Sequence, residues 1–374
     1  MPSRTDSPAT LLPSLPNGAR VLILRLRSLG DALLLTPSLR ALKQWRPDLQ
    51  LSVLLYQRFA PILEGNPDVE EVIALDSEGP TAPLELTRTA AHLNERRFAA
   101  CFNLHGNTLS ALLTLASGAP HRLGLARHRF AFAYTQRAPD PRAFLGRERI
   151  HTVEVQLSLF QWAGLPAGEI PPLQVFPQPK ARGAVARKLD TCGVARGRYA
   201  VLHPVANFFT KEWPFERYAA LAQWLEDEQG LVPVFIAGPG EGAKLDAVER
   251  ASSRPLRRLE SLAIPELVAL VESASLFIGN DSGPAHIAAA LARPTVVLFG
   301  SSDSEAWGPW SRAGGKQRVV QNDFVCNPCR GDRCYAFERP ECILSITQEQ
   351  VRAAVRALTT PAKEELVAVR TRAR

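Results

Sequence analysis

Asp31 closes the polar stretch Arg25–Asp31, which follows a short apolar run and precedes leucines at helical spacing. A carboxylate between a strand and a helix can act as a general base on an acceptor hydroxyl. The same spacing also suits a structural role, in which Ser28 caps the helix and Asp31 takes its third position, where the helix dipole favours negative charge. Spacing alone leaves both roles open.

Residues 279–286 read Gly-Asn-Asp-Ser-Gly-Pro-Ala-His and form a second candidate site. A strand ends here, and a helix is expected to begin at the proline, which suits a first helical turn. Amide groups at a helix N-terminus bind anions such as a diphosphate, and glycine allows close approach. The candidates are Asp281, Ser282, Gly283 and His286. The alternative is a capped helix with a histidine in the core.

Two other loops after strands offer a cation and an acid. Lys211 follows the strand that ends at Leu202 and can bring a point charge to a phosphate, although most lysines are simply solvated. Glu241 lies in the glycine-rich stretch 238–242 and can hydrogen-bond a ribose or a base edge. The glycine spacing there is G-x-G-x-G, which departs from the dinucleotide fingerprint G-x-G-x-x-G.

Four of the six cysteines, Cys326, Cys329, Cys334 and Cys342, form one cluster with the spacing C-x2-C-x4-C-x7-C. Four thiolates at such spacing can hold zinc or iron in a structural site. The second half lacks the paired C-x2-C of a zinc ribbon, so free thiols are an equal alternative. A disulfide pair is less favoured in a reducing compartment.

The elements that must position these residues alternate between strand and helix. Apolar runs predict strands at 21–24, 51–55, 72–75, 99–104, 199–202, 232–237, 276–279 and 295–299. Helical spacing predicts helices at 35–45, 84–93, 109–115, 151–163, 215–228, 242–251, 264–272 and 347–358. This order is typical of α/β domains with parallel sheets, in which ligands bind at the carboxyl ends of the strands.

A proline-rich stretch at 166–179 divides the chain into two α/β series. We expect a disordered leader at 1–18 and a first Rossmann-like domain at 19–178. A second domain follows at 179–346, and a C-terminal helix with a charged tail at 347–374. A flexible arginine-rich loop is expected between residues 120 and 150.

The chain has 374 residues, 46% of them hydrophobic, a formal net charge of +7 and a pI near 9.3. This length suits two domains, and the excess of basic over acidic residues favours anionic partners. No apolar run approaches the ~20 residues of a membrane-spanning helix. Pro13 and Pro16 interrupt the leucines near the N-terminus, which argues against a signal peptide. A cytoplasmic protein is therefore expected.

Together these loops resemble glycosyltransferase family 9, the bacterial lipopolysaccharide heptosyltransferases. The segments that carry the resemblance are residues 21–37, 59–67, 211–214, 279–286, 298–300 and 308–310. The cysteine-rich segment, residues 326–342, is also similar to one found in many members. The resemblance runs from residue 20 to residue 358. The sequence departs from the family pattern at 207–210, where smaller polar residues are expected before the lysine.

The resemblance implies a GT-B fold, in which two Rossmann-like domains face a central cleft. The first domain then takes the acceptor and the second takes the donor, ADP-heptose. The implied reaction is an inverting transfer that requires no cofactor, so zinc or iron at the cysteines would be structural. Asp31 falls on the family's proposed base, which takes a proton as the acceptor oxygen attacks the anomeric carbon.

The donor residues follow from the same resemblance. Lys211 and the helix N-terminus at Ser282 and Gly283 would stabilise the departing ADP, where negative charge develops. Asp281 falls on an acid that holds the donor sugar. His286 falls on the phosphate-side histidine. Glu241 is a looser match to the nucleotide-binding acid.

The implied acceptor is the lipopolysaccharide inner core, either Kdo-lipid A or a core that already carries heptose. It is an anionic lipid-linked sugar, so a basic face on the first domain would collect it from the membrane surface. Arg58, Arg122 and Arg127 are the acceptor-binding candidates. We expect peripheral contact with the inner face of the inner membrane and no nucleic-acid partner.

Three alternatives have distinct signatures. An enzyme of the same fold could transfer heptose to a polypeptide, with the cysteine cluster as a docking finger. A nucleic-acid-binding module could use the basic charge and a cysteine metal finger, but the charge is spread and no aromatic–basic RNA signature is present. A nicotinamide oxidoreductase is disfavoured by the glycine spacing around Glu241.

Overall fold

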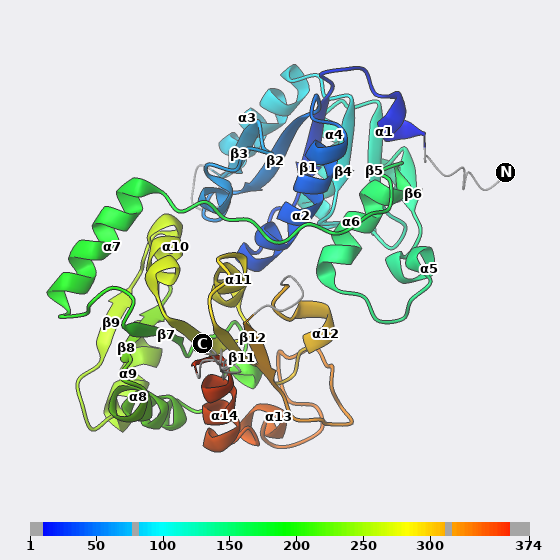
Figure 1. Cartoon of the computed structure of the whole chain (residues 1–374). Coiled ribbons are helices and arrows are strands. Elements are labelled where there is room, and N and C mark those ends of the chain that lie inside the picture. The colour runs from blue at the N-terminus through cyan, green and yellow to red at the C-terminus, as the bar shows by residue number, and fades with distance from the viewer. Residues whose placement is uncertain (1–9, 77–81, 311–315, 360–374) are drawn as a thin grey trace, which may run out of the picture.

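The chain folds into two domains, each built on a six-stranded parallel sheet (Figure 1). The computed structural model describes residues 10–76, 82–310 and 316–359. The strand order is β3-β2-β1-β4-β5-β6 in the first sheet and β12-β11-β10-β7-β8-β9 in the second. Both are the order of a doubly wound nucleotide-binding sheet, so the expected pair of Rossmann-like domains is confirmed. In such sheets ligands bind where the order reverses, beside β1 and β4 and beside β7 and β10.

The first domain extends from α1 to α6. Its strands are β1 (Arg20–Leu24), β2 (Gln50–Tyr56), β3 (Glu71–Leu75), β4 (Ala100–Asn103), β5 (His121–Leu125) and β6 (Gln136–Ala138). Its helices are α1 (Leu11–Ser14), α2 (Leu29–Trp45), the 3₁₀ helix η1 (Ala60–Leu63), α3 (Ala82–Glu95), α4 (Thr108–Ala116), the 3₁₀ helix η2 (Ala131–Ala133), α5 (Pro141–Leu145) and α6 (Thr152–Trp162). The central strands β1 and β4 are almost wholly buried, because helices cover both faces of a parallel sheet.

The second domain extends from α7 to α14. Its strands are β7 (Tyr199–His203), β8 (Val232–Ala237), β9 (Arg257–Glu260), β10 (Leu276–Asn280), β11 (Thr295–Leu298) and β12 (Gln317–Val320). Its helices are α7 (Pro179–Thr191), the 3₁₀ helix η3 (Phe209–Lys211), α8 (Phe215–Gln229), α9 (Gly242–Ala251), α10 (Ile264–Ser273), α11 (Gly283–Ala290), α12 (Ser304–Trp307), α13 (Glu341–Leu344) and α14 (Gln348–Thr359).

Helix α2 is the main element of the first domain that faces the second. Pro37 lies inside it and lacks the N–H that would bond to Leu33. The hydroxyl of Thr36 donates to that carbonyl at 2.7 Å and accepts the backbone N–H of Gln174 at 3.0 Å. The extended linker between α6 and α7 is thereby fixed to α2, and Figure 1 shows it running across the molecule.

Helices α2 and α11 pack against each other across the two domains. A small apolar cluster joins Leu34 of α2, Val153 of α6, Leu173 of the linker and Ala289 of α11. Figure 1 shows α11 between the two sheets, next to one end of α2. The contact therefore fixes the first turns of both helices relative to each other.

The expected disordered leader is wrong for residues 10–18. Leu11 and Leu12 of α1 are buried, and the N–H of Leu12 donates to the Ala163 carbonyl at 2.9 Å. Arg46 donates to the Leu12 carbonyl at 3.0 Å. The prolines that interrupt the leucines prevent a long apolar helix but not this single turn. Residues 1–9 lie outside the described residues.

The expected flexible loop at 120–150 is also wrong, because it contains β5, β6 and α5. The arginines interrupt the apolar pattern that would predict strands here, and β6 is a three-residue edge strand with only one buried position. The helix α14 does not stand apart from the second domain, because Val351 and Val355 are in that domain's core. The charged tail at 360–374 lies outside the described residues.

Within the described ranges, no helix is both long and apolar enough to cross a membrane.

Candidate active site

The first turns of α2 and α11 are in contact between the two domains. A Cβ atom on Gly30 would lie 2.8 Å from Cδ2 of His286, and one on Gly283 would lie 3.0 Å from Cβ of Leu29. A methyl group at either glycine would push the helices apart. The positive ends of two helix dipoles therefore meet at this junction, which favours an anionic ligand.

Asp31 takes the third position of α2 and accepts three hydrogen bonds. Its Oδ2 accepts from the N–H of Ser28 at 2.9 Å and from the Ser28 hydroxyl at 3.1 Å, and its Oδ1 accepts from the Arg25 guanidinium. The capping role considered for Ser28 and Asp31 is therefore real. A carboxylate has about four acceptor positions, so one remains for an acceptor hydroxyl. The two roles of Asp31 are compatible.

Lys211 and Asp281 form an ion pair beside the carboxyl ends of β7 and β10. Nζ of Lys211 lies 2.7 Å from Oδ2 of Asp281, and the hydroxyl of Ser302 donates to the same oxygen at 2.5 Å. The carboxylate side chain is only 9% exposed. The lysine is thus already oriented by a carboxylate, and a phosphate entering here would compete with Asp281 for Nζ.

Ser282 precedes α11 but does not cap it with its side chain. Its hydroxyl donates to the Asn280 carbonyl at 3.0 Å and lies 3.0 Å from Nδ1 of His203. Burial lowers the pKa of His203 to about 4, so this ring is neutral at pH 7. Because no side chain caps α11, its first turn still presents its dipole to a ligand.

His286 lies in α11 and is buried against Gly30. Burial lowers its pKa to about 4, although the carboxylates of Asp281 and Asp31 act in the opposite direction. Nδ1 of the ring is buried and has no hydrogen-bond partner among the described residues. An unpaired buried nitrogen is costly, and an oxygen atom of a ligand would satisfy it.

Glu241 lies directly before α9, and one of its oxygens accepts the N–H of Gly238 at 2.7 Å. Helix α9 is joined to the loop that carries Lys211, because Lys244 forms an ion pair with Glu212. The structure thus places Glu241 one strand away from Lys211, with one carboxylate oxygen already used by its own loop.

His105 and His128 lie on the first-domain side of the junction and were not selected from the sequence. They follow β4 and β5 at their carboxyl ends. Burial lowers the pKa of each to about 4, and the nearby charges of Arg25 and Arg27 for His105, and of Arg127 for His128, act in the same direction. The rule that ligands bind at the carboxyl ends of strands would have selected both.

Two of the three acceptor candidates follow the carboxyl ends of strands in the first sheet, and the third lies at the amino end of a strand. Arg58 and Arg127 are exposed and follow the carboxyl ends of β2 and β5. Arg122 lies at the amino end of β5, and its guanidinium donates to the carbonyls of Ala133 at 3.0 Å and Ala119 at 2.7 Å. Arg122 therefore stabilises its own domain at the edge away from the junction, and its selection as an acceptor ligand is wrong.

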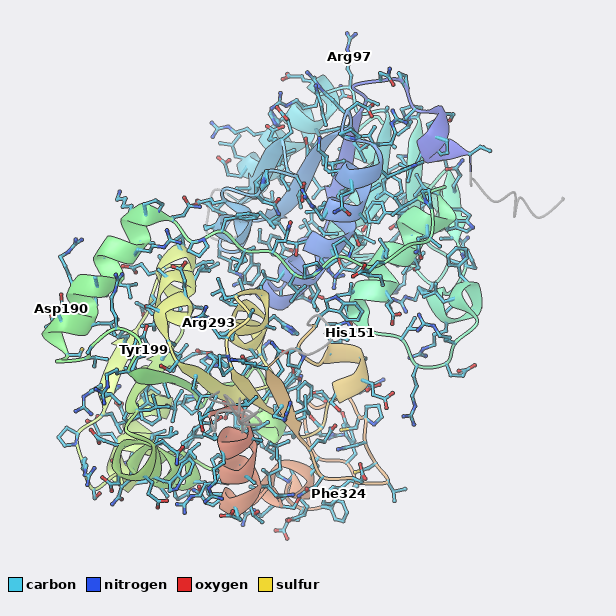
Figure 2. All side chains as sticks on the ribbon, in the orientation of Figure 1. Arg97, His151, Asp190, Tyr199, Arg293 and Phe324 are labelled. Carbon is cyan, nitrogen blue, oxygen red and sulfur yellow. The ribbon has the colours of Figure 1, made fainter. Side chains whose placement is uncertain are left out.

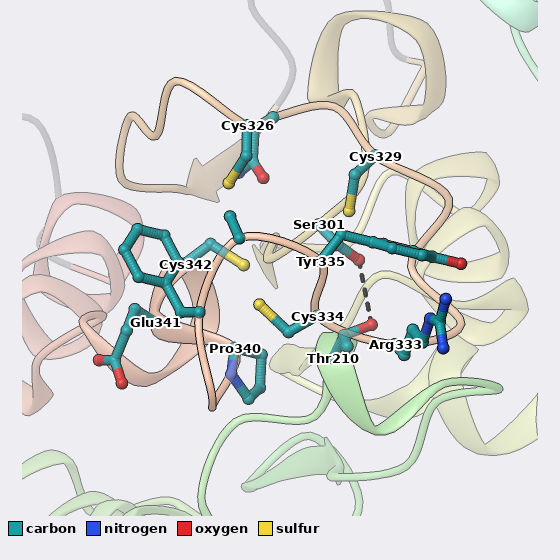
Figure 3. A pocket seen from close by; sticks show the side chains of 13 residues that line it. Thr210, Ser301, Cys326, Cys329, Arg333, Cys334, Tyr335, Pro340, Glu341 and Cys342 are labelled. Carbon is teal, nitrogen blue, oxygen red and sulfur yellow. Dashed lines mark hydrogen bonds between the residues drawn. The ribbon is translucent and has the colours of Figure 1, made fainter.

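The four clustered cysteines line one pocket of the second domain (Figure 3). All six cysteines of the chain are free, so no disulfide forms. Burial raises the pKa of Cys342 to about 11, which keeps its thiol protonated at pH 7. Among the described residues, no three His, Cys, Asp or Glu side chains are close enough together to hold a metal ion.

His151 lies where the two domains meet, as Figure 2 shows. Its Nε2 lies 2.9 Å from the Gly308 carbonyl, and its ring lies 4.8 Å from that of Trp310. The ring also caps α6, since Nδ1 accepts the N–H of Val153 at 3.1 Å. Gly308 and Trp310, at the two ends of the segment 308–310, thus contact His151 where the two domains meet.

The chain is similar in sequence to known glycosyltransferases. The model of glycosyltransferase family 9 (heptosyltransferase) matches residues 86–337. The chain is 30% identical over 295 residues to lipopolysaccharide heptosyltransferase 3 of Escherichia coli K12, which covers 75% of this chain and 83% of that protein.

Solved structures show the same fold. The family 9 glycosyltransferase of Veillonella parvula has a TM-score of 0.78 at 21% sequence identity, and the match covers 92% of this chain and 98% of that one. An Escherichia coli heptosyltransferase solved with ADP has a TM-score of 0.67 at 21% identity, covering 90% of this chain and 99% of that one.

Proposed function

The chain belongs to glycosyltransferase family 9, and we propose that it transfers heptose from ADP-heptose to the lipopolysaccharide inner core. The acceptor is Kdo-lipid A or a core that already carries heptose. The observation that carries the proposal is the junction of α2 and α11, where an acid, a lysine and two helix N-termini come together between the domains.

The donor diphosphate binds at the first turn of α11. Lys211 and the amides near Ser282 and Gly283 face the bridging and terminal phosphates, while Asp281 hydrogen-bonds a hydroxyl of the donor sugar. The neutral ring of His286 meets a phosphate oxygen through a protonated ring nitrogen. Glu241 binds the ribose with its second oxygen. The relative solved with ADP supports the choice of nucleotide.

The transfer itself needs a base on the acceptor side. Asp31 accepts the proton of the acceptor hydroxyl as that oxygen attacks the anomeric carbon from the face opposite the diphosphate. The bond between the anomeric carbon and the phosphate oxygen breaks, and its electron pair leaves with ADP. Negative charge grows on the diphosphate, where Lys211 and the helix dipole stabilise it. Attack from the opposite face inverts the configuration.

The first domain offers positive charge to an anionic acceptor. Arg27, Arg58 and Arg127 are exposed and follow the carboxyl ends of three strands of one sheet. Carboxylates and phosphates of an inner-core acceptor are suited to guanidinium groups, which bind such anions with two parallel hydrogen bonds. This distribution supports the acceptor class.

We also propose that the first domain contacts the inner face of the inner membrane. Phe132 is 67% exposed, and Leu112 of α4 is 50% exposed. Helix α4 and η2 pack together through Ala111 and Ala133, so both apolar side chains lie on neighbouring elements. Arg129 lies beside this region, with its guanidinium 6.0 Å from the ring of Phe130. Apolar side chains next to arginines are typical of surfaces that bind anionic lipid.

The experiment that tests the function is a transfer assay with ADP-heptose and three acceptors: Kdo-lipid A, a heptosylated core and an unfolded polypeptide. We expect ADP release and a product one heptose heavier with one of the lipid acceptors and none with the polypeptide. Product from the polypeptide alone would replace the lipid acceptor with a protein one. Failure with all three, in a chain that binds ADP, would contradict the donor sugar.

A further inference from the structure

The cysteine-rich segment, residues 326–342, contacts two loops of the donor side (Figure 3). One loop follows β7 and carries Thr210 and Lys211. The other follows β11 and carries residues 300–302. Each loop supplies one of the two groups that bind the carboxylate of Asp281.

Thr210 joins the first loop to the segment through its hydroxyl. Its Oγ1 donates to the Gly331 carbonyl and lies 3.2 Å from Oγ of Ser301, the dashed line of Figure 3. Thr210 is 1% exposed, so water does not compete for these bonds. Gly331 has a φ of +80°, and a Cβ there would lie 2.9 Å from Oγ of Ser301. Glycine thus permits both the turn and the close approach.

The second loop is joined to the segment by its backbone. The N–H of Cys329 donates to the Ser301 carbonyl at 3.0 Å, and Nδ2 of Asn327 donates to the Gly300 carbonyl at 2.8 Å. The two loops also touch each other, since a Cβ on Gly300 would lie 2.5 Å from the Thr210 carbonyl oxygen. No methyl group fits between them.

These contacts connect the segment, the two loops and the carboxylate of Asp281 to one another. Lys211 follows Thr210 directly and lies 2.7 Å from the carboxylate, whereas Ser302 follows Ser301 directly and lies 2.5 Å from the same oxygen. A shift of the segment would therefore move both groups relative to one carboxylate. Short, buried contacts of this kind transmit displacement, because packed interiors do not deform freely.

We propose that the cysteine-rich segment is a brace that sets the geometry of Lys211, Asp281 and Ser302, and that Thr210 is a positioning residue for the nucleotide diphosphate. The inference rests on the proposed function, because it takes Lys211 and Asp281 as donor-binding groups. The four cysteines line the pocket inside the brace. The cysteine spacing alone does not predict this role of the segment.

The test compares Thr210→Val with Thr210→Ser in the full chain, with ADP as the probe. Valine keeps the shape of threonine but removes the hydroxyl and leaves the Gly331 carbonyl without its donor. We expect the dissociation constant for ADP, measured by calorimetry, to rise about tenfold in T210V and to stay within about twofold in T210S. The KM for the acceptor should not change in either variant, which separates positioning from general destabilisation.

Hydrogen exchange gives a second measurement that does not depend on nucleotide. In T210V the amide of Cys329 should exchange faster than in the wild type and in T210S, because its partner loop is no longer fixed. Equal ADP affinity in T210V and the wild type, or unchanged exchange at Cys329, would contradict the proposed role of the segment as a brace. Neither result would contradict the proposed function. A wild type that binds no ADP would instead overturn the proposed function and with it the role of Thr210.

Discussion

Gly30 of the first domain and His286 of the second lie in direct contact, so that a Cβ on Gly30 would be 2.8 Å from Cδ2 and 3.4 Å from Nε2 of the ring. Gly30 is the second residue of α2 and precedes Asp31. His286 belongs to α11, which begins two residues after Asp281. The contact therefore sets how closely the proposed base approaches the donor-binding groups.

Gly30→Ala should separate the two helices. The added methyl group meets a buried ring that cannot move freely, so we expect a loss of about 1–3 kcal/mol in the free energy of unfolding. Catalytic efficiency should fall by at least about tenfold, since a small misplacement of reacting groups is costly. Denaturant unfolding and steady-state kinetics measure both.

Gly183→Ala is the matched control for this substitution. Gly183 lies in the middle of α7, and a Cβ there would meet only a side-chain atom of Arg187, at 3.7 Å. This variant should gain roughly 0.5–1 kcal/mol of stability, because alanine is the better helix residue, and should keep full activity. Equal effects of the two substitutions would argue against the contact at Gly30.

Lys211→Met should weaken donor binding. It removes the charge that faces the diphosphate while keeping most of the apolar stem. We expect the dissociation constant for ADP to rise by about 10- to 100-fold, corresponding to about 1.4–2.8 kcal/mol. The control is Lys244→Met, which removes a lysine that pairs with Glu212 on the neighbouring loop. A Lys244 variant that loses as much ADP affinity would point to a diffuse charge effect.

Arg127→Glu should impair acceptor binding and spare the donor. Arg127 is exposed at the carboxyl end of β5, on the first-domain side of the junction. Reversing its charge should raise the KM for the lipid acceptor by about tenfold at low salt and less at high salt, because exposed charges are screened. The KM for ADP-heptose should stay the same. Arg250→Glu, an exposed charge reversal in the second domain, serves as the control, and an equal effect there would remove Arg127 from the site.

Acid should destabilise the protein through its buried histidines. Burial lowers the pKa of His203 and of His286 from 6.5 to about 4 in the folded chain. Below pH 6.5 the unfolded chain takes up protons first, so the stability that each neutral ring provides is present above pH 6.5 and is lost as the pH falls toward 4. Each histidine should cost up to about 1.4 kcal/mol per pH unit in this window.

His203→Asn tests this dependence. The variant should show a shallower fall in unfolding free energy between pH 6.5 and 4 than the wild type. His92→Asn, which replaces a histidine whose side chain is 42% exposed, provides the comparison. If the His203 variant keeps the full slope, proton uptake at other groups accounts for the acid sensitivity.

The fold was predictable because the apolar runs were short and regularly spaced. The eight strands expected from the sequence all formed, and the two parallel-sheet domains are confirmed. The expectation missed β5, β6, β9 and β12, which lie at sheet edges or next to them and carry charged or exposed residues. Such strands lack the continuous apolar pattern of a buried strand.

The site was predictable only in part. The rule that ligands bind at the carboxyl ends of parallel strands led to Asp31, Lys211 and Asp281, whose roles in the reaction stay predictions. Arg122 was misassigned, since composition does not tell at which end of a strand an arginine lies. The contact between Gly30 and His286 joins residues more than two hundred positions apart, and no local pattern reveals it.

In the proposed reaction, Asp31 removes the acceptor proton at the junction of α2 and α11. Asparagine at this position keeps an oxygen that can accept from Ser28, so the helix cap should survive. The decisive measurement is the transfer rate of Asp31→Asn with ADP-heptose and the lipid acceptor, together with its affinity for ADP. We predict a fall in kcat of about 10²-fold or more with ADP affinity unchanged. A variant that binds ADP normally and transfers heptose at the wild-type rate would show that Asp31 is not the base.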